Sequence, residues 1–215
     1  MSLKLYYSPG ACSFVPHALL EASGAAYEPM LVKLHKGEQK SPEYTAINPR
    51  GQVPVLVDGD EVITQILAIC LYLDEKFPQC GFLPAKGVAR AHALEALAWM
   101  NNTAHPTFTH VFMPGKFIGD EDGQAKVKAR AIETFQGVLA ELEALVAKKP
   151  GEWLSGAHFG PLDAYALTLA RWGTFAAIKP AAHPTLWAHV HHVAAHPAVA
   201  RVMERERLQL DVSPA

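Results

Sequence analysis

The chain has 215 residues, half of them hydrophobic and 19% charged, which is the balance of a folded globular protein. Its 19 Lys and Arg against 21 Asp and Glu leave a net charge of −2, so no basic field directs it to nucleic acid or to an anionic membrane. No apolar run approaches the roughly 18 residues of a membrane-spanning helix, and the first residues lack the apolar core of a signal peptide. Three cysteines (Cys12, Cys70 and Cys80) form neither a metal-ligand spacing nor an even disulfide set, so we expect a reducing, cytoplasmic location.

The first 80 residues alternate between strand-like and helix-like segments. Periodicity predicts, in chain order, strand 3–7, helix 13–23, strand 29–34, an irregular polar loop 35–44, strand 53–57, strand 61–63 and helix 65–76. Asp-Gly-Asp at 58–60, between the last two strands, is a hairpin signal. The segments therefore predict a mixed sheet, because a strand–helix–strand connection suits parallel strands and a hairpin joins antiparallel ones.

After residue 80 the pattern becomes helical. Helices are predicted over 88–104, 124–148, 161–178, 184–195 and 197–207. In the second of these, apolar residues recur at 3-4-3-4 spacing, which is one amphipathic face. Pro and Gly residues concentrate between the two halves of the chain. We therefore expect an α/β domain over 1–80, a linker over 81–87 and an all-helical domain over 88–215.

Cys12 lies in Tyr-Ser-Pro-Gly-Ala-Cys-Ser at 7–13, between the first predicted strand and the first predicted helix. A thiol at a helix N-terminus faces unpaired N–H groups and the positive end of the helix dipole, and both favour the thiolate. The alternative is a buried, inert cysteine, which is the commoner fate of a free cysteine when only the residue type is known. Its position favours a chemical role.

Two further segments present polar backbone groups. Val53-Pro54 places a proline at the entry of an apolar strand, which indicates either an ordinary strand start or a cis bond that frees the Val53 backbone to pair with an extended ligand. Thr64 is a candidate N-cap for the next helix, leaving the N–H groups of Gln65 and Ile66 open to a carboxylate. Together, the three segments describe a site for a peptide-like anion beside a thiol.

These residues resemble a bacterial glutathione S-transferase, closest to the beta class. The matching motifs are Leu-Tyr-Tyr-Ser-Pro-Gly-Ala-Cys-Ser at 5–13, Asn-Pro-Arg-Gly-Gln-Val-Pro-Val-Leu at 48–56, Thr-Gln-x-x-Ala-Ile-x-x-Tyr-Leu at 64–73, His-Pro-x-Phe-x-x-x-Phe-x-Pro at 105–114 and Gly-x-His-Phe-x-x-x-Asp-Ala-Tyr at 156–165. The resemblance covers nearly the whole chain. It implies a thioredoxin-like N-terminal domain, an all-helical C-terminal domain, a homodimer and glutathione as cosubstrate, with no metal.

The resemblance also implies roles for individual residues. Cys12 would contact the glutathione sulfur, with Ser13 as a neighbouring hydroxyl, and His105 from the second domain would hydrogen-bond Cys12 or the substrate. The residues expected to bind glutathione itself are Lys36, Val53, Pro54, Gln65, Ile66 and Asn102, the last in the same or the other subunit. The alternatives are a solvated loop lysine for Lys36 and a core or surface histidine for His105.

The chain departs from the family pattern at four positions. Val15 replaces the second cysteine of a thioredoxin-like Cys-x-x-Cys, which argues against dithiol cycling. Ile66 replaces a serine whose hydroxyl helps to hold the γ-glutamyl carboxylate, and Pro106 replaces a lysine, which removes a positive charge from the site. Gly160 replaces a Ser or Thr helix cap, a change that concerns folding.

Three functions follow from this pattern. The first is conjugation of glutathione to an apolar electrophile, bound near Phe108, Phe112, Trp172 and Phe175. The second is a thiol reductase or peroxidase acting through a Cys12–glutathione mixed disulfide. The third is a non-catalytic ligand-binding protein, which Ile66 and Pro106 favour. His189, His192 and His196 share one helix face, and we expect a surface or interface helix there rather than a metal site.

Overall fold

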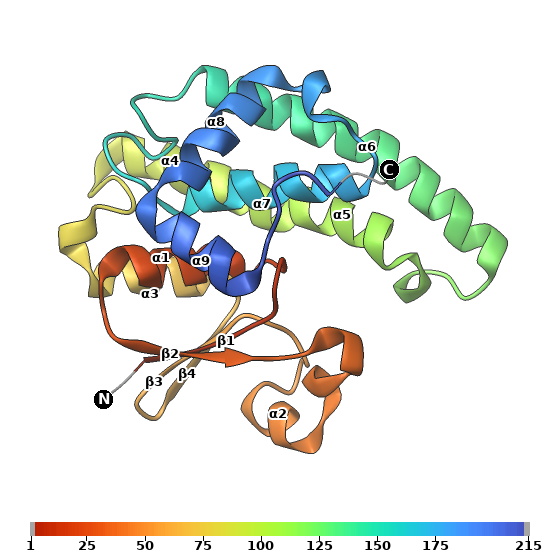
Figure 1. Cartoon of the computed structure of the whole chain (residues 1–215), viewed down its shortest axis with the longest axis horizontal. Helices are drawn as coiled ribbons and strands as arrows, with labels where there is room; N and C mark the ends of the chain where they lie inside the picture. Colours follow the sequence, from red (N-terminus) through yellow and green to blue (C-terminus); the bar gives the residue numbers. More distant parts are fainter. Residues whose placement is uncertain (1–2, 213–215) are drawn as a thin grey trace.

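A computed structural model describes residues 3–212 of the chain (Figure 1). Its four strands are β1 (Leu3–Tyr7), β2 (Tyr27–Leu31), β3 (Val55–Asp58) and β4 (Glu61–Thr64), in the spatial order β2-β1-β3-β4. β1 and β2 are parallel, whereas β1 and β3, and β3 and β4, are antiparallel. The predicted mixed sheet is confirmed. Helices α1 (Phe14–Ser23) and α3 (Ile66–Lys76) lie between the sheet and the rest of the molecule (Figure 1).

The second half of the chain is helical, as predicted. Its helices are α4 (Gly87–Trp99), a π-helical turn (Met100–Ala104), α5 (His105–Phe112), α6 (Glu121–Ala147), α7 (Pro161–Phe175), α8 (Pro184–Ala195) and α9 (Pro197–Glu206). The fold is a thioredoxin-like domain followed by a helical domain. None of the helices among residues 3–212 combines the length and apolar character needed to cross a membrane.

The segment after β1 and α1 differs from its prediction in two ways. β2 ends at Leu31 rather than at residue 34. It forms an edge of the sheet, so the missing N–H of Pro29 costs no hydrogen bond between strands. The irregular loop predicted over 35–44 is wrong, because short 3-10 turns are followed there by α2 (Pro42–Ile47). Ser41 caps α2 by accepting the N–H of Tyr44, and Pro42 fits the first helical turn.

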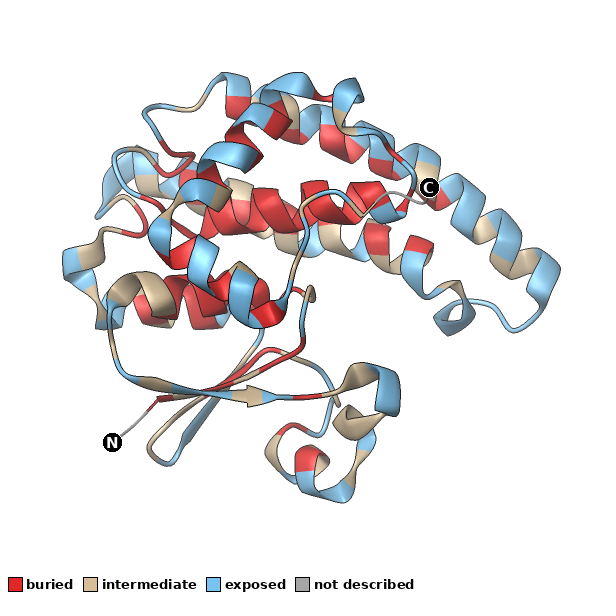
Figure 2. Ribbon diagram, viewed as in Figure 1, coloured by how far each residue is buried: buried red, intermediate tan, exposed pale blue. Residues whose placement is uncertain are grey.

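Helix α7 is the centre of the helical domain. Every residue from Pro161 to Thr174 is buried, which appears in Figure 2 as a continuous red band through the middle of the molecule. α7 packs against α1, α6 and α8, so one hydrophobic cluster runs from the α1 face of the sheet to the helical domain. The two halves of the chain therefore share a core, and the loop after β1 is held against α7, where Trp172 donates to the Gly10 carbonyl.

The Asp163 carboxylate links α7 to its surroundings. Oδ2 accepts the N–H of Gly160 at 3.0 Å, and Oδ1 accepts the N–H of Leu154 at 2.8 Å and contacts Nε2 of His189 at 3.0 Å. His189 is only 3% exposed, so the surface-helix prediction is wrong for this residue. Its imidazole belongs to the packing of α7 against α8. Among residues 3–212, no group of three or more His, Cys, Asp or Glu side chains is arranged to hold a metal ion.

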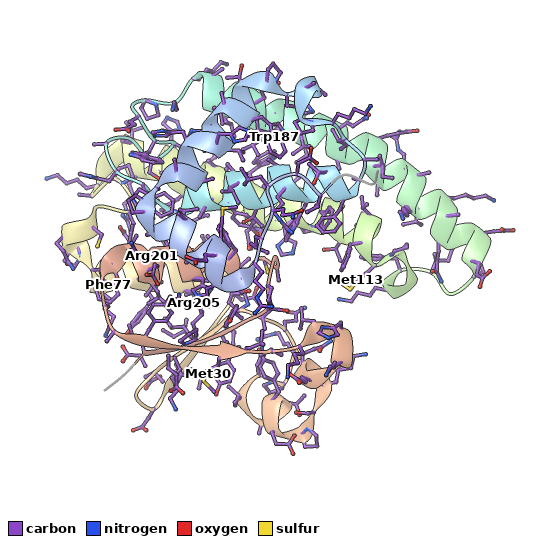
Figure 3. The ribbon with its side chains drawn as sticks, in the orientation of Figure 1. Met30, Phe77, Met113, Trp187, Arg201 and Arg205 are labelled. Atoms are coloured by element: carbon purple, nitrogen blue, oxygen red, sulfur yellow. The ribbon has the colours of Figure 1, made fainter. Side chains whose placement is uncertain are left out.

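The last helix is joined to the first by a buried carboxyl group. Glu206 of α9 is 3% exposed; Oε1 lies 2.7 Å from Nδ1 of His17 on α1, and Oε2 accepts the N–H of Gly10 at 2.9 Å. At the surface, Arg201 and Arg205 of α9 pair with Glu21 of α1 (Figure 3). The buried contacts matter more, because exposed ion pairs contribute little to stability.

We predict that Glu206→Ala lowers the free energy of unfolding by about 3 kcal/mol, since it leaves the buried Nδ1 of His17 and the half-buried N–H of Gly10 without their acceptor. Chemical denaturation measures the change. Glu204→Ala is the matched control, because Glu204 is exposed on the same helix and its loss is expected to cost within about 0.5 kcal/mol. Equal effects of the two substitutions would contradict the prediction.

Candidate active site at the start of the first helix

The loop from Ser8 to Cys12 is held by its own backbone and by α7. Gly10 has a φ of +70°, which L side chains rarely adopt, and a Cβ there would also displace the Arg171 guanidinium, which would lie 2.8 Å away, so glycine is favoured. The Gly10 carbonyl accepts the indole N–H of Trp172 at 3.0 Å. This bond ties the loop that carries Cys12 to the centre of the helical domain.

Ser13 serves the same loop. Its hydroxyl donates to the Ser8 carbonyl at 3.2 Å and accepts the Ser8 N–H at 3.1 Å, and the residue is fully buried. The expectation that Ser13 contacts a bound thiolate is not supported, because its only hydroxyl proton is already donated to Ser8. Ser13 instead sets the turn that leads into α1.

The structure brings Cys12 and the Val53-Pro54 segment together. The Cys12 thiol donates to the Val53 carbonyl across 3.6 Å, and of the two alternatives for Pro54 the structure has the cis Val53–Pro54 bond. Two side chains fix the residue before Val53: the Gln52 carbonyl accepts the Tyr44 hydroxyl at 2.8 Å and the Asn48 side-chain amide at 2.7 Å. Tyr44 and Asn48 were not predicted from the sequence; Asn48 lies within the 48–56 motif, but the pattern did not reveal which way its amide points.

Burial decides the ionisation of Cys12. The residue is 8% exposed, and this burial raises the pKa of its thiol to about 12, although its own N–H and that of Ser13 act in the opposite direction. In the ligand-free protein, burial therefore outweighs the start of the helix, which favours the thiolate. Cys12 remains a thiol, which can donate a hydrogen bond to an anionic sulfur.

The third predicted segment begins α3. Gln65, not Thr64, is the N-cap, with an unusual φ of +74°, and Thr64 is the last residue of β4. The side chain of Gln65 is exposed, whereas Ile66 is 4% exposed and belongs to the hydrophobic core. Ile66 can therefore offer a ligand only its backbone N–H, which has no partner within the helix.

Lys36 lies apart from this core packing. It is exposed in a 3-10 turn that spans Leu34–Lys36. Its long side chain is free to reach an anion, but its backbone position alone does not assign it a ligand.

His105 follows the π-helical turn of the second domain. Its Nδ1 lies 2.9 Å from the hydroxyl of Tyr165, and its ring packs edge-on to Trp172 at 4.9 Å. Since Trp172 also bonds to Gly10, His105 stands one side chain away from the loop that carries Cys12. Burial, and then the positive charge of Lys116, lower the pKa of His105 to about 4, so the imidazole is neutral at physiological pH.

The π-helical turn changes which asparagine accompanies His105. Asn101 lies 3.4 Å from the Tyr165 hydroxyl, whereas Asn102 is exposed and contacts only Asn101 among the contacts resolved between described residues. Pro106 explains the turn, because a proline ring clashes with the carbonyl four residues earlier in a regular helix. A wider turn just before Pro106 removes that clash and shifts the helix face by about one residue.

The predicted electrophile site is an aromatic stack. Phe108 stacks on Trp172 at 4.6 Å and on Phe112 at 5.9 Å between ring centres. Phe108 and Trp172 are buried, whereas Phe112 is 63% exposed and Phe175, one turn after Trp172, is 46% exposed. Met113, at the same end of α5, is labelled in Figure 3. A separate cavity of about 490 Å³ lies between α5 and α6 and contains none of the predicted site residues.

Comparisons with known proteins show which family this chain resembles. The family model of the glutathione S-transferase N-terminal domain matches residues 1–75. Glutathione S-transferase GstA of Escherichia coli O157:H7 is 31% identical over 210 residues, which are 96% of this chain and all of the relative. This chain belongs to the glutathione S-transferase family.

Solved transferases have the same fold. A sphingomonad glutathione S-transferase complexed with glutathione is 32% identical, with a TM-score of 0.83 over 96% of this chain and all of that one. The bacterial beta class glutathione S-transferase of Sphingomonas chungbukensis is 29% identical, with the same TM-score and coverage. This transferase therefore shares its overall fold, over nearly its whole length, with solved members of the family.

We predict that His105 makes the stability of this transferase depend on pH between 6.5 and about 4. Because the folded-state pKa is lower than the ordinary 6.5, the unfolded chain binds more protons, and stability is lost as the pH falls through this window. The loss attributable to His105 amounts to up to about 3 kcal/mol. Urea denaturation across this range measures it.

His105→Gln should flatten that part of the profile. The exposed His92→Gln on α4 is the control and should follow the wild-type protein. Parallel profiles for the wild-type protein and His105→Gln would show that His105 does not titrate abnormally.

Proposed function

We propose that this protein conjugates glutathione to an apolar electrophile, with the glutathione sulfur bound beside Cys12. One observation carries the proposal: the Cys12 thiol lies 3.6 Å from the carbonyl of Val53, beside the cis-proline segment whose backbone the sequence offers to an extended peptide. A cysteinyl backbone paired with Val53 would place its own sulfur next to Cys12. The family relationship and the relatives solved with glutathione support this reading.

In this mechanism Cys12 acts as a hydrogen-bond donor: once the cysteinyl N–H of glutathione pairs with the Val53 carbonyl, the Cys12 proton turns from that carbonyl to the glutathione sulfur. Its raised pKa keeps the proton on Cys12, so the thiol can stabilise the thiolate of glutathione rather than compete with it as a nucleophile. The raised pKa also disfavours the mixed-disulfide route, because thiol–disulfide exchange needs the thiolate of the attacking cysteine. Glutathione then attacks an electrophile held close by, and proximity contributes to the rate.

The two ends of glutathione would meet different groups. The γ-glutamyl carboxylate fits the free N–H groups at the start of α3 and the exposed side chain of Gln65. Lys36 would pair with the glycyl carboxylate. Since the Ile66 side chain is buried, this protein holds the γ-glutamyl end through backbone groups and Gln65 without a serine hydroxyl.

The electrophile would bind on the stack of Phe108, Phe112 and Trp172, near Phe175. Aromatic faces with an exposed end suit a flat apolar ligand, and this sets the substrate class rather than one compound. We further propose a homodimer, in which Asn102 reaches the glutathione of the other subunit, and a reducing cytoplasmic location, where free thiols such as Cys12 persist.

Substitution of Cys12 tests the donor role. We expect the conjugation of an aryl halide to persist in Cys12→Ser, which keeps an O–H donor, and to fall about 10-fold or more in Cys12→Ala, which loses one hydrogen bond to a charged sulfur. Calorimetry measures glutathione binding for each variant. Cys80→Ser, outside the site, is the matched control and should behave as the wild-type protein does.

Two results would count against this function. Absence of glutathione binding to the wild-type protein would contradict both enzymatic mechanisms. Equal loss of activity in Cys12→Ser and Cys12→Ala, together with a disulfide reductase activity that both variants lack, would favour the mixed-disulfide mechanism instead.

A further inference from the structure

A short chain of hydrogen bonds runs from His105 into the core. The hydroxyl of Tyr165, on the buried helix α7, lies 2.9 Å from Nδ1 of His105 and 3.4 Å from Oδ1 of Asn101. The side-chain amide of Asn101 in turn donates to Oδ1 of Asn102 at 2.9 Å. Tyr165 is fully buried, so its hydroxyl depends on these protein partners.

The number of protons available to these hydrogen bonds decides which group donates in each of them. A tyrosine hydroxyl has one proton, and Oδ1 of Asn101 can only accept. If Tyr165 donates to Asn101, then His105 must donate from Nδ1, and both contacts are hydrogen bonds. If Tyr165 donates to His105 instead, the lone pairs of the Tyr165 hydroxyl and of Asn101 Oδ1 face each other at 3.4 Å, and the hydrogen bond between these two residues is lost. The first arrangement satisfies the buried groups, and it leaves Nε2 of His105 without a proton.

One side chain, Trp172, connects His105 to the loop that carries Cys12. The His105 ring packs on Trp172, whose indole bonds to Gly10, two residues before Cys12. Burial, and then the negative charges that Cys12 and Cys70 would carry as thiolates, raise the pKa of Tyr165. The same raised pKa keeps the proton on Tyr165, so the phenol remains a hydrogen-bond donor.

We propose that Tyr165 and Asn101 are positioning residues that hold neutral His105 with its proton on Nδ1, so that Nε2 accepts the thiol proton of bound glutathione. This inference rests on the proposed conjugation. As the sulfur attacks the electrophilic carbon, the S–H bond breaks and its proton moves to Nε2. The sulfur electron pair forms the S–C bond, and the leaving group departs with its bonding pair, so no oxidation occurs.

The charges around His105 agree with this role. The positive charge of Lys116 acts on the His105 ring. Tyr165 and Trp172 of α7, which contact the same ring, are uncharged, and so is the Cys12 thiol. Burial and Lys116 both disfavour a charged imidazole, so the resting ring is neutral and able to accept a proton.

The tautomer can be observed directly in the ligand-free protein. Nitrogen-15 NMR of histidine-labelled protein, with His105 assigned by the signals missing from His105→Gln, should show the proton on Nδ1. Asn101→Leu removes the acceptor of the Tyr165 proton and should move the His105 proton to Nε2, whereas Asn101→Asp, which keeps an acceptor oxygen, should not. A wild-type His105 protonated on Nε2, or one that Asn101→Leu leaves unchanged, would overturn the proposal.

Kinetics separate positioning from a general loss of structure. Tyr165→Phe should lower kcat about 10-fold, as expected when an acid–base group loses its orientation, with the KM for glutathione unchanged. In the His105→Gln background, the same substitution should have no further effect. Thr168→Val, which removes another buried hydroxyl of α7 bonded only to its own helix, is the control and should keep full activity.

A loss of equal size in both backgrounds would show that Tyr165 supports the fold and not His105. If Tyr165→Phe does not fold, the NMR comparison of the Asn101 variants decides the proposal alone. A wild-type protein that binds no glutathione would contradict the proposed function, while the tautomer of His105 would still be measured separately.

Discussion

The site depends on the contacts that the buried carboxyl group of Glu206 makes. It joins the end of the chain to its beginning, because it accepts the Gly10 N–H and contacts His17 within the core. Gly10 is also bonded to Trp172 through its carbonyl. The loop that carries Cys12 is therefore fixed from both sides by helices of the second domain. Without these contacts, a loop that contains Pro9 and Gly10 would have little reason to keep one conformation.

Burial against α7 has a chemical consequence at Cys12. The two N–H groups at the start of α1 favour a thiolate, but removal of the thiol from water outweighs them and raises its pKa. The residue thereby keeps the proton that a hydrogen-bond donor needs. Desolvation also dominates at His105, where it acts on a base and keeps the ring neutral. The same physical effect thus sets the resting protonation of both groups.

The second domain shows how one local substitution changes a site. Pro106 stands where the family pattern has a lysine, and its ring also requires a wider helical turn just before His105. That turn brings Asn101 to Tyr165 and leaves Asn102 in solvent. Similarly, Ile66 fills the core under α3, so the start of this helix presents Gln65 and backbone groups. Both departures from the family alter the surroundings of the site rather than its overall fold.

The sequence alone determined the mixed sheet and the helical second half, because these depend on hydrophobic periodicity, and it offered the cis bond at Pro54 as one of two alternatives. It also determined the family, through motifs that are local in the chain. Only the tertiary structure decided that Cys12 is a protonated thiol, that Ser13 bonds to Ser8, and that Tyr165 and Asn101 stand behind His105. Those properties depend on desolvation and on hydrogen bonds between side chains as far apart as His105 and Tyr165, which no local pattern records.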